Sequence, residues 1–96
     1  MNNTHELVLT ITNEAGLHLR PAALFVRTAA LFRSDIRITN LSRGPNKDVN
    51  AKSMMGLMQL GVGPGQQVRL RATGDDAAAA VAALEHLVAN NFAEQP

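Results

Sequence analysis

Residues 7–29 read LVLTITNEAGLHLRPAALFVRTA, and the spacing of their apolar side chains changes partway along. From His5 to Thr12, apolar and polar side chains alternate, which is typical of a β-strand with one buried face. From residue 18 to residue 33, apolar side chains recur every three or four positions, which predicts an amphipathic helix. Phe25 and Phe32 lie on this apolar stripe, so we expect both to anchor the core.

The same two patterns alternate through the rest of the chain. They predict a strand at 35–39, a return strand through Val49, a helix at 53–60, a strand at 67–73 and a helix from about 75 to 90. The segment SRGPN at 42–46 is rich in turn formers and predicts the hairpin turn. The order β-α-β-β-α-β-α predicts an α+β fold, an antiparallel sheet with the helices packed on one side.

Two of the predicted helices start with residues that commonly cap helices. We expect the Ser53 hydroxyl to accept a hydrogen bond from the second or third N–H of the short helix. Asp75 and Asp76 favour the start of the last helix by capping and through the helix dipole. The glycines at 61, 63 and 65 predict a helix stop and a turn, because no lysine or dinucleotide spacing of a phosphate-binding loop accompanies them.

Composition excludes several classes of protein. The chain has 96 residues, 46% of them hydrophobic and 18% charged, so we expect a single domain over residues 1–96. It has no cysteine, which excludes thiol catalysis and disulfides. A net charge of +1 and the lack of a long apolar run argue against nucleic-acid binding and membrane insertion. We expect a cytoplasmic protein.

The segment GLHLRPAA at 16–23 carries the first candidate site. A helix start leaves backbone N–H groups without partners and carries partial positive charge, so it favours anions and disfavours an imidazolium at His18. Arg20 adds a fixed cation suited to a phosphate, and Pro21 is tolerated in the first turn. Gly16 permits an unusual backbone angle or a close approach of another molecule just before His18. The pattern therefore favours a neutral, nucleophilic His18 that becomes a phosphohistidine stabilised by Arg20.

Other functions remain as alternatives. In the simplest of them, His18 only caps the helix and Arg20 is a solvated charge. A metal site is disfavoured, because His5, His18 and His86 lie in different predicted elements. A hydrolase would need a second acid or base near His18, and a nucleic-acid surface would need exposed aromatic residues, whereas the aromatic content is 3%.

The segment VNAKSMMGLMQLGVGPG at 49–65 carries the second candidate site. Ser53 at a helix start is a position where a phosphate is favourable. Leu57 and Leu60 share one helical face and already supply an inward stripe. We therefore expect the methionines to form an exposed, adaptable docking surface rather than core filler: Met54, Met55 and Met58.

Together, GLHLRPAALFV and NAKSMMGLMQLGV resemble the HPr family, the histidine-containing phosphocarriers of the bacterial phosphoenolpyruvate-dependent sugar phosphotransferase system. The resemblance covers essentially the whole chain. It implies an open-faced β-sandwich, a four-stranded antiparallel sheet with three helices on one face. It also implies a phosphoryl-group carrier rather than an enzyme, with no cofactor or metal, acting as a monomer.

The resemblance implies a role for each candidate residue. His18 matches the histidine phosphorylated on Nδ1, which receives its phosphoryl group from enzyme I and passes it to an enzyme IIA, and Arg20 matches the arginine that interacts with that group. Ser53 matches the serine that an HPr kinase/phosphorylase modifies in many members. The methionines match the apolar docking patch, and its basic rim is matched by Arg27 and Lys52.

Three departures from the family pattern stand out. Leu19 adds apolar bulk beside His18, Ala15 replaces a small polar residue near the phosphoryl group, and the hairpin segment NLSRGPNKD is longer than the usual compact turn. The resemblance also leaves a second function open: an HPr-like regulator that acts through Ser53 phosphorylation and binds a transcriptional regulator.

Overall fold

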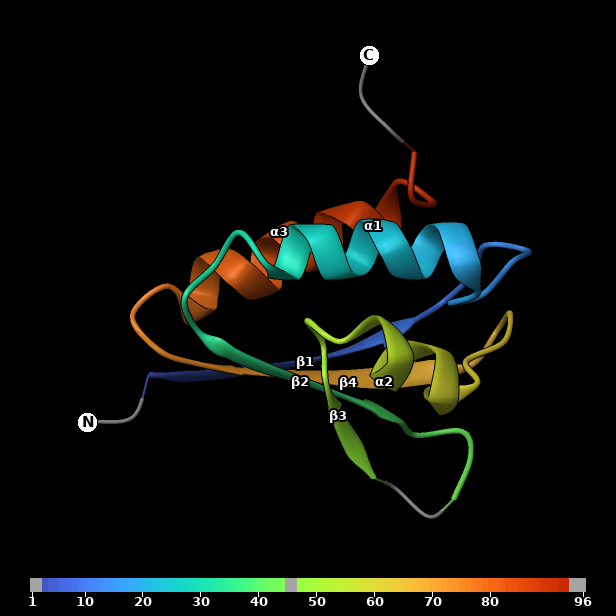
Figure 1. The fold of residues 1–96 in the computed structure, drawn as a ribbon, viewed down its shortest axis with the longest axis horizontal. Helices are drawn as coiled ribbons and strands as arrows, with labels where there is room; N and C mark the ends of the chain where they lie inside the picture. Colours follow the sequence, from blue (N-terminus) through green and yellow to red (C-terminus); the bar gives the residue numbers. More distant parts are fainter. Residues whose placement is uncertain (1–2, 45–46, 94–96) are drawn as a thin grey trace.

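The computed structural model describes residues 3–44 and 47–93 (Figure 1). The elements follow the predicted order: β1 Thr4–Thr10, α1 Leu19–Ala29, β2 Asp35–Asn40, β3 Asp48–Asn50, α2 Met54–Leu60, β4 Gln67–Thr73 and α3 Ala77–Ala89. Residues 45–46 of the predicted hairpin turn lie outside the described residues. Within the described ranges, none of the helices combines the length and the apolar character that crossing a membrane requires.

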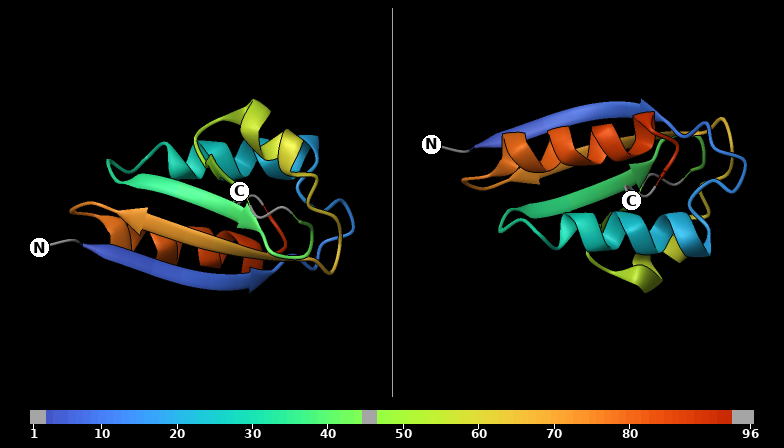
Figure 2. Two further views of the ribbon diagram at one scale, coloured as in Figure 1. Left: turned by 90° about the horizontal axis from the view of Figure 1, so that it is seen from below. Right: turned by 90° about the horizontal axis from the view of Figure 1, so that it is seen from above.

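The four strands form one antiparallel sheet in the order β1-β4-β2-β3. β4 lies inside the sheet, where Leu70 is paired with Leu7 of β1 on one side and Ile38 of β2 on the other. Figure 2 shows α1 and α3 lying over one face of this sheet, and α2 packs against α1 and β3. The predicted open-faced α+β sandwich is confirmed.

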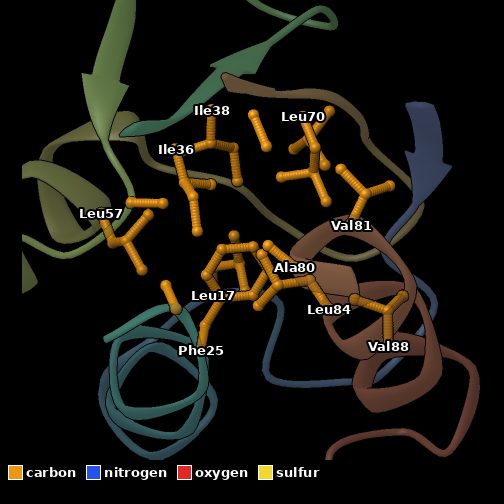
Figure 3. Close-up of a cluster of buried hydrophobic side chains, with 14 of the residues drawn as sticks. Leu17, Phe25, Ile36, Ile38, Leu57, Leu70, Ala80, Val81, Leu84 and Val88 are labelled. Atoms are coloured by element: carbon orange, nitrogen blue, oxygen red, sulfur yellow. The ribbon is translucent and has the colours of Figure 1, made fainter. Parts of the chain in front are cut away.

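The core fills the space between the sheet and the helices (Figure 3). α1 contributes Phe25, α2 contributes Leu57 and α3 contributes Leu84, and each of these side chains is 0% exposed. They face the side chains of Ile36 and Leu70 from the sheet. Burying a side chain of this size contributes roughly 1.5–3 kcal/mol. This packing holds α1 in place and so fixes where the helix begins.

The first helix is shorter than the sequence predicts. It ends at Ala29, and the N–H groups of Leu31 and Phe32 bond to the carbonyls of Thr28 and Ala29 at 3.1 and 3.2 Å. Bonds that reach three residues back tighten the last turn and end the helix. Phe32 therefore lies beyond the helix and is only partly buried against the core, whereas Phe25 is fully buried. The prediction is correct for Phe25 and wrong for the placement of Phe32 on the helix.

The start of α3 also differs from the prediction. Asp76 occupies the N-cap position, but its side chain makes no capping hydrogen bond. Its carboxylate instead accepts hydrogen bonds from the Ser34 hydroxyl and from the backbone N–H groups of Arg33 and Ser34, at 2.8 and 2.9 Å for the two N–H groups. These bonds favour the charged carboxylate, so the Ser34 hydroxyl, followed by the Arg33 N–H, lowers the pKa of Asp76 below its ordinary value of 3.8. Asp76 therefore ties α3 to the connection between α1 and β2.

Replacing Asp76 with asparagine is expected to destabilise the fold at neutral pH, because the amide offers one acceptor oxygen where the carboxylate offers two. A carboxyl whose folded-state pKa is lowered contributes its stability above its unfolded pKa and loses it as the pH falls through the folded pKa. The difference in unfolding free energy between parent and variant should thus be largest at neutral pH and shrink in strongly acidic solution. Urea unfolding followed by circular dichroism measures this difference, and a difference that widens on acidification would contradict the assignment.

Candidate functional site

His18 is the N-cap residue of α1 and is exposed to solvent. Its backbone is extended, with φ −82° and ψ −164°, and its carbonyl accepts the N–H of Ala22 at 2.8 Å, which starts the helical hydrogen bonding. Its side chain makes no capping hydrogen bond. His18 is thus confirmed at the N-cap position through its backbone and not its ring, and the imidazole is accessible from outside the protein.

The first turn of α1, next to His18, has backbone N–H groups without a helical hydrogen-bond partner. The N–H groups of Leu19 and Arg20 precede the first helical bond, and Pro21 has none to offer. The first turn of a helix also carries partial positive charge. An anionic group attached to His18 would therefore lie in a favourable field.

The loop before His18 is pressed against the segment that follows α2. Gly16 has a φ of +56°, and the N–H of Leu17 donates to the carbonyl of Val62 at 2.9 Å. A Cβ atom on Gly16 would lie 2.4 Å from the Val62 oxygen and 2.9 Å from Cα of Gly63. The unusual backbone angle predicted for this glycine is thus confirmed, and the close approach is made by another segment of the same chain, where the sequence analysis expected another molecule.

Two polar residues that the sequence did not single out hold these loops. The Asn13 amide donates to the carbonyl of Gly16 at 2.8 Å. Gln66 Oε1 accepts the N–H of Gly63 at 2.9 Å and the Asn40 amide at 3.1 Å. Asparagine and glutamine in loops have no periodic pattern, and their partners are known only once the loops are brought together, so sequence analysis had no signal for them.

Arg20 and Arg27 are both exposed on α1, in its first and last turns. They are seven residues apart, close to two helical turns, so they lie on the same side of the helix and roughly 10 Å apart along its axis. Arg20 stands two residues after His18. The structure thus places Arg20 in the helical turn that follows His18 and Arg27 farther along the same side of α1 as Arg20, and a role for either in binding a phosphoryl group stays a prediction.

Lys52 lies in a different environment. It is partly buried, and its ammonium donates to the carbonyl of Phe32 at 2.6 Å, just beyond the C-terminal end of α1. His18 stands at the opposite end of this helix, which spans Leu19–Ala29 and is therefore roughly 16 Å long. The structure does not bring the ammonium of Lys52 to His18, and a role for Lys52 in the docking rim stays a prediction.

Ser53 caps α2 as predicted. Its hydroxyl oxygen accepts the N–H of Gly56, the third residue of the helix, at 3.0 Å. Gly56 is closely surrounded, because a Cβ there would lie 3.3 Å from both Ser53 Oγ and Val49 Cβ. Ser53 itself is partly exposed. The same hydroxyl is therefore a structural cap and a group that a modifying partner could reach.

Of the three methionines predicted to form a docking surface on α2, two are exposed, and one apolar residue of α1 is exposed as well. Met55 is 71% exposed and Met58 42%, whereas Met54 is partly buried and packs against the core. Leu19, directly after His18, is also 71% exposed. Singly exposed apolar side chains are common on proteins, so a docking role for these residues stays a prediction.

Comparison with known proteins identifies the family. Residues 6–90 match the family model described as "PTS HPr component phosphorylation site". The chain is 45% identical to the phosphocarrier protein HPr of Haloferax volcanii over 91 residues, which cover 94% of this chain and 99% of the relative.

Solved structures agree with this match. HPr from Thermoanaerobacter tengcongensis superposes with a TM-score of 0.85 at 48% identity, covering 96% of this chain and 99% of that one. Crh, the Bacillus subtilis catabolite repression HPr, gives a TM-score of 0.65 at 40% identity and covers 88% and 94% of the two chains. The protein is thus one of the phosphocarriers of the phosphotransferase system. The chain belongs to the HPr family.

Proposed function

We propose that this protein relays phosphoryl groups through His18, from enzyme I to the enzyme IIA domains of a phosphoenolpyruvate-dependent sugar uptake system. The observation that carries the proposal is that the ring of His18, at the start of α1, is exposed and makes no capping hydrogen bond. Two different partners must present a reacting histidine to the same ring in turn, so an open position serves the relay better than an enclosed one.

The chemistry at His18 is a transfer between two nitrogen atoms. A lone pair on the His18 ring, at Nδ1 in our proposal, attacks the phosphorus of the phosphohistidine on enzyme I. The new N–P bond forms as the old one breaks, and the donor imidazole leaves. The return step onto enzyme IIA is the same exchange with His18 as leaving group, so no water or cofactor takes part.

Arg20 and the helix start stabilise the charge that arrives with the phosphoryl group. Arg20 offers a cation and several N–H donors within reach of a group on the neighbouring turn. Backbone N–H groups at the start of α1 add donors whose direction is fixed by the helix. Arg27 extends the positive charge along the same side of α1, which suits acidic partner surfaces.

The relay is tested with purified enzyme I, labelled phosphoenolpyruvate and an enzyme IIA. We expect label to appear first on this protein and then on enzyme IIA, at a rate that requires all three components. Label reaching enzyme IIA equally fast without this protein would contradict the proposal.

Ser53 is proposed as a regulatory phosphorylation site for an HPr kinase/phosphorylase. A phosphate there would add about −1.5 to −2 charge at pH 7 close to Met55, within the docking region. Acidic partners would be repelled, while the fold would be kept, because negative charge is favourable at the start of a helix.

The variant Ser53→Asp is expected to slow phosphoryl uptake from enzyme I by about tenfold through this repulsion. Aspartate and asparagine are both good N-caps and are nearly equal in size, so Ser53→Asn is the matched control and should transfer at close to the parental rate. Assays quenched at successive times measure the rate of phosphoryl uptake, and circular dichroism measures whether the fold is kept. Equal slowing in both variants would mean that the hydroxyl, not the charge, matters.

A second candidate function is regulation through Ser53 and a transcriptional regulator, without a role in transport. The likeness to Crh, whose name records catabolite repression, favours keeping this candidate. Mass spectrometry after incubation with phosphoenolpyruvate and enzyme I, and separately with ATP and HPr kinase, separates the two. Label on His18 in the first mixture supports the relay, and label on Ser53 alone supports the regulator.

A further inference from the structure

A cavity of about 350 Å³ lies between the β2–β3 hairpin and the end of α2, apart from His18. Its volume falls in the range of small-molecule sites, roughly 300–1,000 Å³. The described residues that line it are Asn40, Arg43, Gly44, Lys47, Val49, Gln59 and Leu60. They comprise two cations, two amides, a glycine and two aliphatic side chains, and no carboxylate.

The hairpin is what creates this space. Residues 41–47 join β2 to β3, where a two-residue turn would suffice for a tight hairpin. The guanidinium of Arg43 reaches back and donates to the carbonyl of Gly61 at 3.2 Å. Arg43 therefore extends towards the end of α2, and both Arg43 and Lys47 line the cavity.

Asn40 forms a rigid, buried part of the lining. It is 3% exposed, its amide donates to the carbonyl of Leu60 at 3.2 Å and to Gln66 at 3.1 Å, and its oxygen accepts the N–H of Ser42 at 3.0 Å. These bonds connect both walls of the cavity. One part of the lining is thus fixed by buried hydrogen bonds, whereas Arg43, Lys47 and Gln59 are exposed.

Among the described residues, the groups near the cavity that could repel an anion accept hydrogen bonds or point away from it. The C-terminal end of a helix repels anions, but the Leu60 and Gly61 carbonyls at the end of α2 already accept bonds from Asn40 and Arg43. The Asp48 carboxylate pairs with Arg37 at 3.3 Å and Arg71 at 3.0 Å. Since Val49 lines the cavity and neighbouring strand residues point to opposite faces, Asp48 points away from it.

We propose that this cavity binds a small organic anion that carries a phosphate or carboxylate group. Lys47 supplies a charge with no carboxylate partner among the described residues, and Arg43 supplies the second charge. The Gln59 side-chain amide can donate to the same anion, and Val49 and Leu60 provide an apolar wall for its carbon atoms. The site does not depend on phosphorylation of His18 or Ser53.

Titration of the ¹⁵N-labelled protein with glycerol 3-phosphate, malonate and neutral glycerol tests the site. We expect saturable shifts of the Gly44, Lys47 and Gln59 amide signals with the anions and none with glycerol. The phosphate and carboxylate arms show which group the site prefers. Shifts confined to residues 18–20 would mean that the anion binds only at the histidine, and would overturn the proposal.

The variant Lys47→Gln should weaken this binding by about threefold to fivefold, the upper part of the range for losing one exposed charged contact. Arg69→Gln is the matched control, because it removes a cation from β4, which does not line the cavity. It should leave the dissociation constant within about twofold of the parent. Equal weakening of anion binding in both variants, or shifts that never saturate, would show only non-specific attraction of the anion to positive charge and would overturn the proposal.

Discussion

Replacing His18 with alanine is expected to abolish acid-labile phosphorylation by enzyme I. The change removes the imidazole, and with it Nδ1, the atom to which we propose the phosphoryl group is bonded. It should leave the fold intact, because the ring is exposed and makes no capping bond. Changes at such surface positions usually alter the unfolding free energy by no more than about 0.5 kcal/mol. Labelling with phosphoenolpyruvate and a urea unfolding curve measure the two effects.

His5→Ala is the matched control for this experiment. It makes the same chemical change at another exposed histidine, on β1. The control should take up label at the parental rate. Label retained by His18→Ala would place the phosphoryl group on another residue and would contradict the proposed role of His18.

Replacing Gly16 with alanine is expected to destabilise the protein by about 2–5 kcal/mol. A side chain at a φ of +56° costs about 1–2 kcal/mol, and crowding by the Val62 carbonyl adds about 1–3 kcal/mol. This is a large share of a typical unfolding free energy of about 5–15 kcal/mol. Phosphoryl uptake by the folded fraction should also slow, because the loop that positions His18 must move away from Val62.

Gly65→Ala separates the two causes. Gly65 also has a positive φ, +80°, but a Cβ there would meet nothing within 4 Å. It should therefore show only the backbone cost, about 1–2 kcal/mol, with normal phosphoryl uptake. Urea unfolding midpoints, compared at an unchanged dependence of unfolding free energy on urea concentration, give the stability of both variants. A smaller loss for Gly16→Ala than for Gly65→Ala would show that the close approach to Val62 is relaxed at little cost.

Local patterns were sufficient to predict the elements of this fold. Strand alternation and helical spacing placed β4 at its observed bounds, Gln67–Thr73, and Ser53 at the N-cap of α2. A positive φ at Gly61 ends α2, as a glycine after a helix predicts. These features depend on a few neighbouring residues, which is why the sequence contains them.

Features that depend on distant partners were not predictable in the same way. Asp76 is a good N-cap by type, yet Ser34 and Arg33 compete for its carboxylate. Likewise, the bond from the Lys52 ammonium to the Phe32 carbonyl joins residues 20 apart in the chain, and nothing in the sequence pattern indicates it. These hydrogen bonds depend on which distant segments the packed core brings together.

The same distinction applies to the candidate site. His18, Arg20 and Gly16 are consecutive enough for one short motif to predict them, and the structure places them together at the start of α1. The support from Asn13, Gln66 and the Val62 carbonyl comes from loops that meet only in the folded chain. The cavity likewise has walls from β2, from described residues of the connection to β3 and from α2, which meet only in the folded chain.

Nitrogen-15 NMR of the histidine rings, recorded before and after incubation with enzyme I and phosphoenolpyruvate, addresses the role of His18 most directly. We expect a ³¹P–¹⁵N coupling on one ring nitrogen of His18, Nδ1, with the rings of His5 and His86 unchanged. A fully phosphorylated sample in which the His18 ring shows no such coupling would contradict the account.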